Sequence, residues 1–516
     1  MGLAGPDEPR YAEVAREMFV TGDYISPRLC GCLWFEKPPL LYWLAAVAYR
    51  LFGVNEFAAR LPSALAAAAA ALFLFHTVAK TVSLRLGGIV SLVLVSTAIF
   101  IGYGRAAAPD MVLTASICIS LCAVRIAGSE VGRARSAYLL IAAAAAGLAV
   151  LSKGLIGIVL IGGILAAAWA VTRRNALKPG DIIPMALVFA VVTSTWYLPV
   201  TIKHGWEFVR EFFINHHFKR YLTNEYHHPE PVYFFLLVAL AGALPWTLYL
   251  APAIGRLRKL GFRNAHERDS LVVFAWIWFL VPIVFFSFSV SKLPGYILPS
   301  FPALALIAGH EIERYMDGER NPVLNVCAWL TGVTMLVLAA AFLIYLHREL
   351  GSGAFAPGLF RYAPVLIAAG AIFFLLRNKR SQFIASGAAF TISLILVSVA
   401  QLSPKLSGKV SLRDLSVKAA AALRAGEKIA FYLDKEYAPV FYAEGRVVCG
   451  VGEGDVLNAY SPDEIVNAAE GEESLVVITY LEKAGDLQSH PRLRTESIAV
   501  QGREVALRVS VSNRPR

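Results

Sequence analysis

The sequence predicts a multi-spanning α-helical membrane protein of about 12 transmembrane helices with a small C-terminal soluble α/β domain. Of the 516 residues, 57% are hydrophobic and only 16% are charged. The mean hydropathy of +0.58 is also higher than soluble domains show. The apolar residues form continuous runs that are long enough to cross a hydrocarbon core of about 30 Å as helices. Such runs stop near residue 402, and the tail that follows has a more polar composition.

Roughly a dozen apolar stretches of about 17 to 25 residues are the predicted spanning helices. They are rich in Ala and Leu and lack the alternation expected of strands in a membrane barrel. In chain order they lie at 57–79, 86–104, 111–128, 136–152, 154–172, 182–202, 232–252, 270–290, 294–313, 323–346, 361–377 and 382–402. In the tail, the pattern predicts a helix near 412–423 and strands at 475–480 and 505–511.

Basic residues are concentrated in alternate loops, and such loops face the cytoplasm in bacterial-type inner membranes. They are Lys80, Arg85, Arg133, Arg135, Arg173, Arg174, Lys178, Arg256, Arg258, Lys259, Arg263, Arg377, Lys379 and Arg380. We therefore predict a multi-pass protein of the cytoplasmic (inner) membrane. It has an extracytoplasmic first loop at 1–56, a transmembrane domain at 57–402 and an extracytoplasmic α/β domain at 403–516.

Charge and cysteine content narrow the function classes. The net charge of +11 arises from residues that lie between apolar runs and set orientation, so membrane lipids rather than nucleic acid are the expected partners. Six cysteines are too few for a disulfide framework in a chain of this length. The pair in Cys30-Gly31-Cys32 leaves a redox or metal-binding role open.

Two acidic motifs lie in the first loop. Asp7 and Glu8 precede an amphipathic segment at 10–19, where they either stabilise the dipole of an interfacial helix or provide a general base for an acceptor hydroxyl. Glu36 and Lys37 are followed by two prolines that fix the chain. Lys37 is suited to bind a phosphate and Glu36 a divalent ion, and the alternative for this pair is a surface salt bridge.

Further ionisable residues lie at the ends of predicted spanning helices on the same side. Asp110 either caps its helix or takes part in catalysis. Lys153 lies in a tight turn at membrane depth, which favours phosphate or donor binding. In the loop 215–221, His217 is a candidate zinc ligand and Arg220 a candidate phosphate ligand, although histidines in such loops are often only solvated. Lys292 adds another cation, close to Tyr296.

These residues together indicate chemistry on a polyprenyl phosphoester. Ionisable groups at membrane depth are costly unless they pair or face water, so we expect these cations and carboxylates to share one extracytoplasmic cavity. A lipid-linked donor would explain why such a site is in the membrane.

At several motifs the sequence resembles the integral-membrane glycosyltransferases of the GT-C class, in particular the aminoarabinose lipid A transferases and the polyprenyl-phosphate-mannose protein mannosyltransferases. The resemblance runs from Asp7 to about Leu402 and rests on the segments at 7–13, 35–43, 59–63, 109–111, 152–154, 217–221, 245–246 and 286–299. In that family a spanning helix precedes the acidic motif. The resemblance therefore implies about thirteen helices in a full-length relative.

The resemblance also implies roles for individual residues. Asp7 and Asp110 are the expected catalytic acids, and Glu36 and His217 are the candidate ligands of a divalent metal, zinc or magnesium-like. The residues expected to bind the donor phosphate are Lys37, Lys153, Arg220, Arg10, Lys292 and Tyr296.

The function that follows is transfer of a sugar, a pentose or a hexose, from an undecaprenyl-phosphate type of donor to a lipid A-type or other cell-envelope acceptor. The family implies inversion at the anomeric carbon. A protein O-mannosyltransferase is the alternative within the enzyme class. A membrane transporter or lipid flippase is the alternative from another class, but we find no clear internal repeat of the kind that transporters show.

Overall fold

The computed structural model describes residues 2–173, 177–212, 230–257, 267–338, 411–433, 437–449, 456–470 and 472–512, with isolated positions between 340 and 393. These residues form two compact units. The terminal unit combines Met1–Pro62 with Ala400–Arg516, and the membrane unit comprises Ser63–Val399. The three-part division drawn from the sequence stays a prediction. No sequence pattern indicated that the first residues and the tail would pack together.

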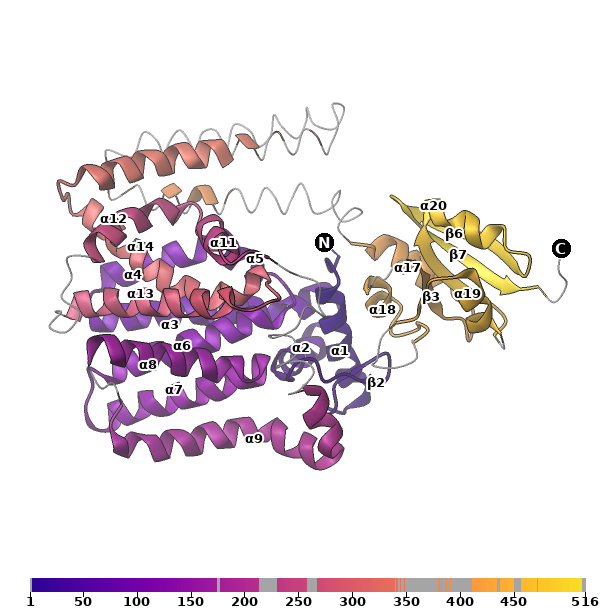
Figure 1. The fold of residues 1–516 in the computed structure, drawn as a ribbon, viewed down its shortest axis with the longest axis horizontal. Coiled ribbons are helices and arrows are strands. Elements are labelled where there is room, and N and C mark those ends of the chain that lie inside the picture. The colour runs from indigo at the N-terminus through magenta and orange to yellow at the C-terminus, as the bar shows by residue number, and fades with distance from the viewer. Residues whose placement is uncertain are drawn as a thin grey trace. The chain divides into compact units, whose positions relative to one another are not determined.

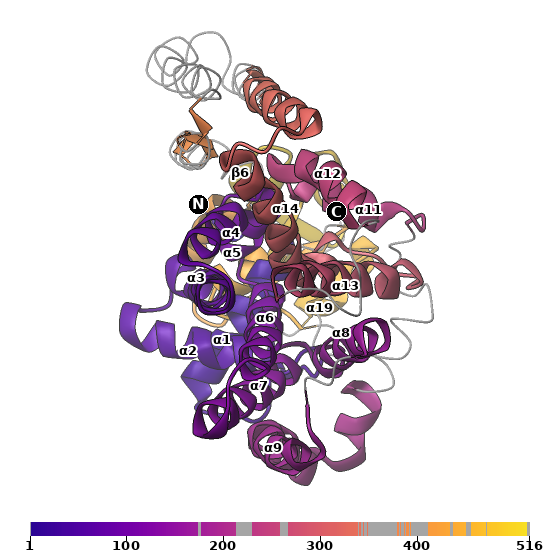
Figure 2. The ribbon, with the colours of Figure 1, turned by 90° about the vertical axis from the view of Figure 1, so that its left-hand side faces the viewer.

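The membrane unit is a bundle of α-helices (Figures 1 and 2). Five helices in the described residues are long and apolar enough to cross a membrane. They are α3 (Glu56–Thr81), whose first turns belong to the terminal unit, α6 (Pro109–Ala127), α7 (Gly132–Lys153), α9 (Pro179–Val209) and α13 (Glu267–Ser287). They confirm the predicted spans near 57–79, 111–128, 136–152, 182–202 and 270–290.

Other predicted spans form shorter helices or lie outside the described residues. The stretch 154–172 forms α8 (Ile156–Thr172), and 294–313 forms a 3₁₀ helix, η3 (Pro294–Ser300), followed by α14 (Phe301–Met316). A further apolar helix covers Pro322–Leu338. The predicted span 361–377 lies outside the described residues, as does most of 382–402.

Two stretches that we predicted as single spans are each broken into bent helices. The stretch 86–104 forms α4 (Leu84–Val95) and α5 (Ala98–Gly104), which meet at 69°. The hydroxyls of Ser96 and Thr97 donate to the carbonyls of Leu92 and Leu94 and end α4. The stretch 232–252 forms α11 (Phe234–Gly242), η2 (Trp246–Tyr249) and α12 (Leu250–Leu257), with a bend of 111°. Pro245 in this break lacks the N–H that a continuous helix needs. If each bent pair is one span, the described residues hold up to seven.

Helix α6 is the centre of the membrane unit and is buried along almost its whole length. Its small polar residues allow close packing and bond to neighbouring helices. The Ser120 hydroxyl donates to the carbonyl of Ala142 in α7 at 2.9 Å. In contrast, α9 leaves large apolar side chains exposed, among them Ile183 at 71% and Val191 at 66%. This surface suits contact with lipid, whereas α6 provides a rigid base for the charged residue in its first turn, Asp110.

The terminal unit has an N-terminal part and a C-terminal α/β part. The N-terminal part consists of α1 (Asp7–Thr21), a hairpin of β1 (Arg28–Leu29) and β2 (Cys32–Leu33), and α2 (Leu40–Phe52). The helices of the C-terminal part are α17 (Arg413–Ala422), α18 (Ala438–Tyr442), α19 (Pro462–Ala469) and α20 (Leu481–Gln488). Its strands are β3 (Ile429–Tyr432), β4 (Asn458–Ala459), β5 (Leu475–Tyr480), β6 (Leu493–Gln501) and β7 (Glu504–Val511).

The strand order in the C-terminal sheet is β4-β3-β5-β7-β6. Strands β4, β3 and β5 are parallel, whereas β7 pairs antiparallel with both β5 and β6. The structure confirms the predicted helix near 412–423 and the strands at 475–480 and 505–511. The sequence patterns did not predict β3, β4 and β6. Strand β4 has only two residues, and β6 mixes half-buried and exposed positions after a single buried one, without regular alternation.

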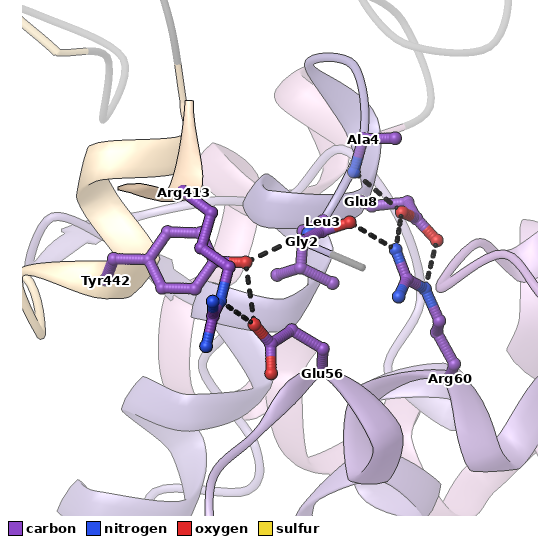
Figure 3. A network of polar contacts seen from close by, with 8 residues as sticks. All are labelled: Gly2, Leu3, Ala4, Glu8, Glu56, Arg60, Arg413 and Tyr442. Atoms are coloured by element: carbon purple, nitrogen blue, oxygen red, sulfur yellow. Dashed lines mark hydrogen bonds and ion pairs between the residues drawn. The ribbon is translucent and has the colours of Figure 1, made fainter. Parts of the chain in front are cut away.

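A polar network joins the N-terminal and C-terminal parts within the terminal unit (Figure 3). Arg60 binds Glu8 through two hydrogen bonds of 3.0 and 2.6 Å. The Tyr442 hydroxyl accepts from the Leu3 N–H at 2.9 Å and donates to Glu56 at 3.1 Å. Arg413 also binds Glu56, at 2.7 Å. The first residues of the chain are therefore held by side chains from α3, α17 and α18.

A second contact between these parts centres on a buried ion pair in α1. The Glu13 side chain is fully buried and accepts two hydrogen bonds of 2.7 Å from Arg16. Both side chains lie against Gly445, which follows α18 and has a positive φ of 78°. Burial raises the pKa of Glu13 to about 7, although Arg16 acts in the opposite direction.

We expect Glu13 to make stability depend on pH. Since its folded pKa of about 7 lies above the ordinary value of 4.5, the folded chain binds this proton more tightly than the unfolded chain. The stabilisation that protonated Glu13 provides is therefore complete below about pH 4.5 and is lost as the pH rises through about 7. Thermal unfolding of wild type and Glu13→Gln in detergent between pH 4.5 and 8 measures this. The stability of wild type relative to the variant should fall with pH, and parallel curves would contradict the assignment.

Candidate active site

The acidic motif opens α1 in the terminal unit. Asp7 and Glu8 occupy the first turn of this helix, where negative charge also favours the helix dipole. The Asp7 side chain remains 54% exposed and forms an ion pair with Arg10 one turn later. Glu8 instead faces Arg60 in α3. Of the two adjacent acids, Asp7 is thus the one that can reach a substrate.

Arg10 lies in an aromatic cage. Its guanidinium carbon is 5.4 Å from the ring centroid of Tyr11, 5.6 Å from Trp34 and 5.4 Å from Tyr437. Burial alone would lower the pKa of Arg10, but nearby Glu36, 3.6 Å from its Nη2, contributes to a net pKa well above the ordinary value. The cage therefore holds a permanent cation next to Asp7.

Glu36 and Lys37 form the second charged pair of the terminal unit. Lys37 Nζ is 2.9 Å from Glu36 Oε1, and both side chains are at most 10% exposed. The pair lies just before α2, at the prolines that open this helix. The alternative prediction for this pair, a salt bridge on the surface, was wrong about its exposure, because both side chains are buried. A buried pair gains little stability over apolar residues, so its presence here fits a binding role.

In the membrane unit, Asp110 and Lys153 form an ion pair. Asp110 is in the first turn of α6, and Lys153 is the last residue of α7, which confirms the predicted turn at this position. Lys153 Nζ is 2.6 Å from Asp110 Oδ1 and 5.0 Å from the ring centroid of Tyr296. The residue before α6, Ala108, makes no side-chain hydrogen bond that caps this helix. Three predicted site residues are thus brought together.

Gly295 permits this close packing. A Cβ atom added there would lie 2.8 Å from Asp110 Oδ1 and from the hydroxyl of Tyr103. The neighbouring Lys292 is engaged differently. Its ammonium donates to the carbonyls of Glu230 at 2.9 Å and Ser289 at 2.6 Å. Lys292 therefore holds backbone in place, whereas Tyr296 and Gly295 shape the surroundings of Asp110.

The metal prediction involves Glu36 and His217. Within the part of the chain that the structure describes, no group of three or more His, Cys, Asp or Glu side chains is arranged to hold a metal ion. The Glu36 carboxylate forms ion pairs with two cations, Lys37 and Arg10. His217 and Arg220 lie outside the described residues. Metal binding stays a prediction.

Sequence reasoning missed several residues around these pairs. Tyr437 comes from the C-terminal part, which carried no recognised motif. Trp34 and Tyr11 lie beside known motifs but have no pattern of their own, and Tyr103 lies in α5, the unexpected short helix. Only Trp34 could have been found from the sequence, because it is an aromatic residue close to the motif of Glu36 and Lys37.

The fold and the clustered charges define a class of membrane enzyme, and comparison with known proteins supports this. Residues 36–198 match the family model described as dolichyl-phosphate-mannose-protein mannosyltransferase. The crystal structure of ArnT from Cupriavidus metallidurans bound to undecaprenyl phosphate superposes with a TM-score of 0.79 at 26% identity, covering 98% of this chain and 94% of ArnT.

Two relatives have the name undecaprenyl phosphate-α-4-amino-4-deoxy-L-arabinose arabinosyl transferase. The protein from Aeromonas hydrophila is 28% identical over 89% of this chain and 86% of its own length. The protein from Erwinia tasmaniensis is 29% identical over 67% of this chain and 63% of its own length. The chain therefore resembles the integral-membrane glycosyltransferases of the GT-C class, in particular the aminoarabinose transferases and the protein mannosyltransferases.

We expect Gly295→Ala to destabilise the protein by about 1–3 kcal/mol, because the added methyl group must displace Asp110 or Tyr103 from a packed position. The matched control is Gly162→Ala in α8, where an added Cβ meets nothing within 4 Å. Thermal unfolding in detergent compares the two. Equal unfolding temperatures would show that the packing around Asp110 is not tight.

Proposed function

We propose that this enzyme transfers a sugar from an undecaprenyl-phosphate donor to a lipid A-type or other cell-envelope acceptor. The observation that carries the proposal is the likeness, over almost the whole chain, to ArnT, whose structure holds undecaprenyl phosphate. A lipid-linked donor also accounts for charged residues at the ends of apolar helices. The names of the curated relatives specify a pentose, which we take as the first donor to test.

In the proposed reaction an acceptor oxygen attacks the anomeric carbon, and the bond from that carbon to the phosphate oxygen breaks with inversion. The leaving lipid phosphate gains negative charge, which positioned cations stabilise. We assign phosphate binding in the terminal unit to Lys37 and Arg10. Both cations already form ion pairs with carboxylates. A bound phosphate would therefore replace a carboxylate as the partner of each cation.

Asp7 is the proposed residue that faces the acceptor. Its exposed carboxylate can take the proton of an attacking hydroxyl, whereas a lipid A phosphate is already ionised and needs no base. Asp110 is the second proposed acid. It fixes Lys153 at the end of α7, and Lys153 with Tyr296 offers a further phosphate-binding group. Arg220 and Lys292 complete the proposed set of cations.

The proposed topology follows from the loop charges. We propose about twelve crossings in this chain, with the bent pairs α4–α5 and α11–α12 each counted as one. The acidic motif, Asp110, Lys153 and the α/β domain then face the extracytoplasmic side of the inner membrane. This is the side on which a lipid A-type acceptor meets a lipid-linked donor.

We expect Asp7→Asn and Lys37→Ala to lower transfer by at least about 100-fold, because they remove the proposed base and a phosphate-binding cation. The measurement uses membranes with labelled undecaprenyl-phosphate pentoses and hexoses, and offers lipid A or envelope proteins as acceptor. The matched controls are Asp414→Asn and Lys418→Ala, two exposed residues of α17.

The controls should transfer like wild type. Equal sugar transfer in wild type, Asp7→Asn and Lys37→Ala would contradict the assignment of Asp7 and Lys37 to the active site. Labelled protein in place of labelled lipid A would favour the mannosyltransferase alternative, which the family match over 36–198 also suggests. A wild type inactive with every donor and acceptor would reopen the transporter alternative.

A divalent ion at Glu36 and His217 is a separate part of the proposal, because a carboxylate and an imidazole are common zinc ligands. When bound, such an ion would neutralise phosphate charge. Metal content of the purified protein is measured for wild type and for Glu36→Gln, before and after chelation. We expect wild type to retain about one ion and the variant to lose it. Wild type without metal, active after chelation, would show that the cations suffice.

A further inference from the structure

Three cysteines gather at one place in the terminal unit. Cys30 lies in the two-residue turn of the β1–β2 hairpin, Cys32 begins β2, and Cys449 lies shortly after α18. The Cys449 Sγ donates to the carbonyl oxygen of Cys30 at 3.0 Å, and neither cysteine takes part in a disulfide. Residues that are far apart in the chain thus bring the free thiol of Cys449 against the residue that carries the free thiol of Cys30.

The turn gives Cys30 an unusual backbone. Its φ is +54° and that of Gly31 is +76°, the combination of a two-residue hairpin turn in which Asn, Asp or Gly is preferred. The Gly31 N–H donates to Glu17 in α1 at 3.0 Å, which fixes the turn. Cysteine has no backbone preference for such a turn. The presence of Cys30 at this position therefore points to a role for its thiol.

The surroundings do not suit a reactive or metal-binding thiol. Burial raises the pKa of both Cys30 and Cys449, so both thiols stay neutral near pH 7 and are poor nucleophiles and metal ligands. In the described residues, the cysteines and nearby acids do not form a metal-binding group. Two neighbouring free cysteines, one on each part of the terminal unit and joined by the contact of the Cys449 thiol with the Cys30 carbonyl, fit a cross-link.

We propose that Cys30 and Cys449 form a disulfide bond that fastens the C-terminal α/β part to the hairpin that follows α1. The proposal rests on the proposed function for its setting, because disulfides persist outside the cytoplasm and the proposed topology places both residues there. The bond would add a covalent tie to the contacts that Tyr437, Tyr442 and Gly445 make with the N-terminal part.

The chemistry is thiol–disulfide exchange with a disulfide oxidant. One thiol, as its thiolate, attacks the oxidant, forms a mixed disulfide and releases a thiol. The second cysteine then attacks the mixed disulfide, which forms the Cys30–Cys449 bond and releases a second thiol. Two protons and two electrons pass from the cysteines to the oxidant. Because both thiols have a raised pKa, each is a poor leaving group when an external thiolate attacks the bond, and this slows later reduction, which suits a structural bond.

The test counts free thiols in the protein taken directly from membranes. The sample is denatured in SDS and labelled with a maleimide polymer, with and without prior reduction. We expect wild type and Cys32→Ser each to gain two labels after reduction. Cys30→Ser and Cys449→Ser should gain none, because each leaves its partner free. Mass spectrometry of a non-reduced digest should show one peptide pair linking Cys30 to Cys449.

A second arm treats purified, reduced protein with oxidised glutathione and does not depend on the compartment. A bond that forms in this arm but is absent in membranes would support the thiol pair and contradict the proposed extracytoplasmic placement. No bond in either arm, or a bond that includes Cys32, would overturn the inference. Sugar transfer is measured separately, so a bonded but inactive protein would count against the proposed function alone.

Discussion

A charge that is removed from water must be neutralised by a partner, and this constraint shapes both units. In the membrane unit Lys153 is paired with Asp110 at 2.6 Å. In the terminal unit Lys37 is paired with Glu36, and Arg10 lies between Asp7 and Glu36. A bare cation in such surroundings would be costly. The cations proposed to bind a phosphate are therefore already paired with carboxylates. In the proposed reaction, donor binding would exchange each carboxylate partner for a phosphate.

Exchange of partners has a consequence for the carboxylates. When a phosphate takes over Lys37 or Arg10, Glu36 and Asp7 lose part of their electrostatic support. An acid that loses a cationic partner becomes a stronger base, because its proton affinity rises. The aromatic rings around Arg10 limit how far this cation can move and keep the exchange local.

The C-terminal part contributes to the terminal unit through one short stretch. Tyr437 covers Arg10, Tyr442 binds Leu3 and Glu56, and Gly445 leaves room for the pair of Glu13 and Arg16. The sheet of the C-terminal part has its own apolar core, and α18 packs against both α17 and α1. The tail thereby supports the helix that carries the acidic motif.

The sequence by itself determined the membrane class, most of the long helices, the two strands β5 and β7, and the charged residues of interest. These follow from local properties, namely apolar length, alternation and the cost of a charge near lipid. Only the tertiary structure decided that Asp110 meets Lys153 and Tyr296, that Tyr437 covers Arg10, and that two predicted spans bend. These depend on contacts between distant residues and on hydroxyl and proline effects at Ser96, Thr97 and Pro245, which no periodicity records. The composition of a segment indicates whether it lies in the membrane or in water, whereas side-chain packing determines which functional groups come into contact.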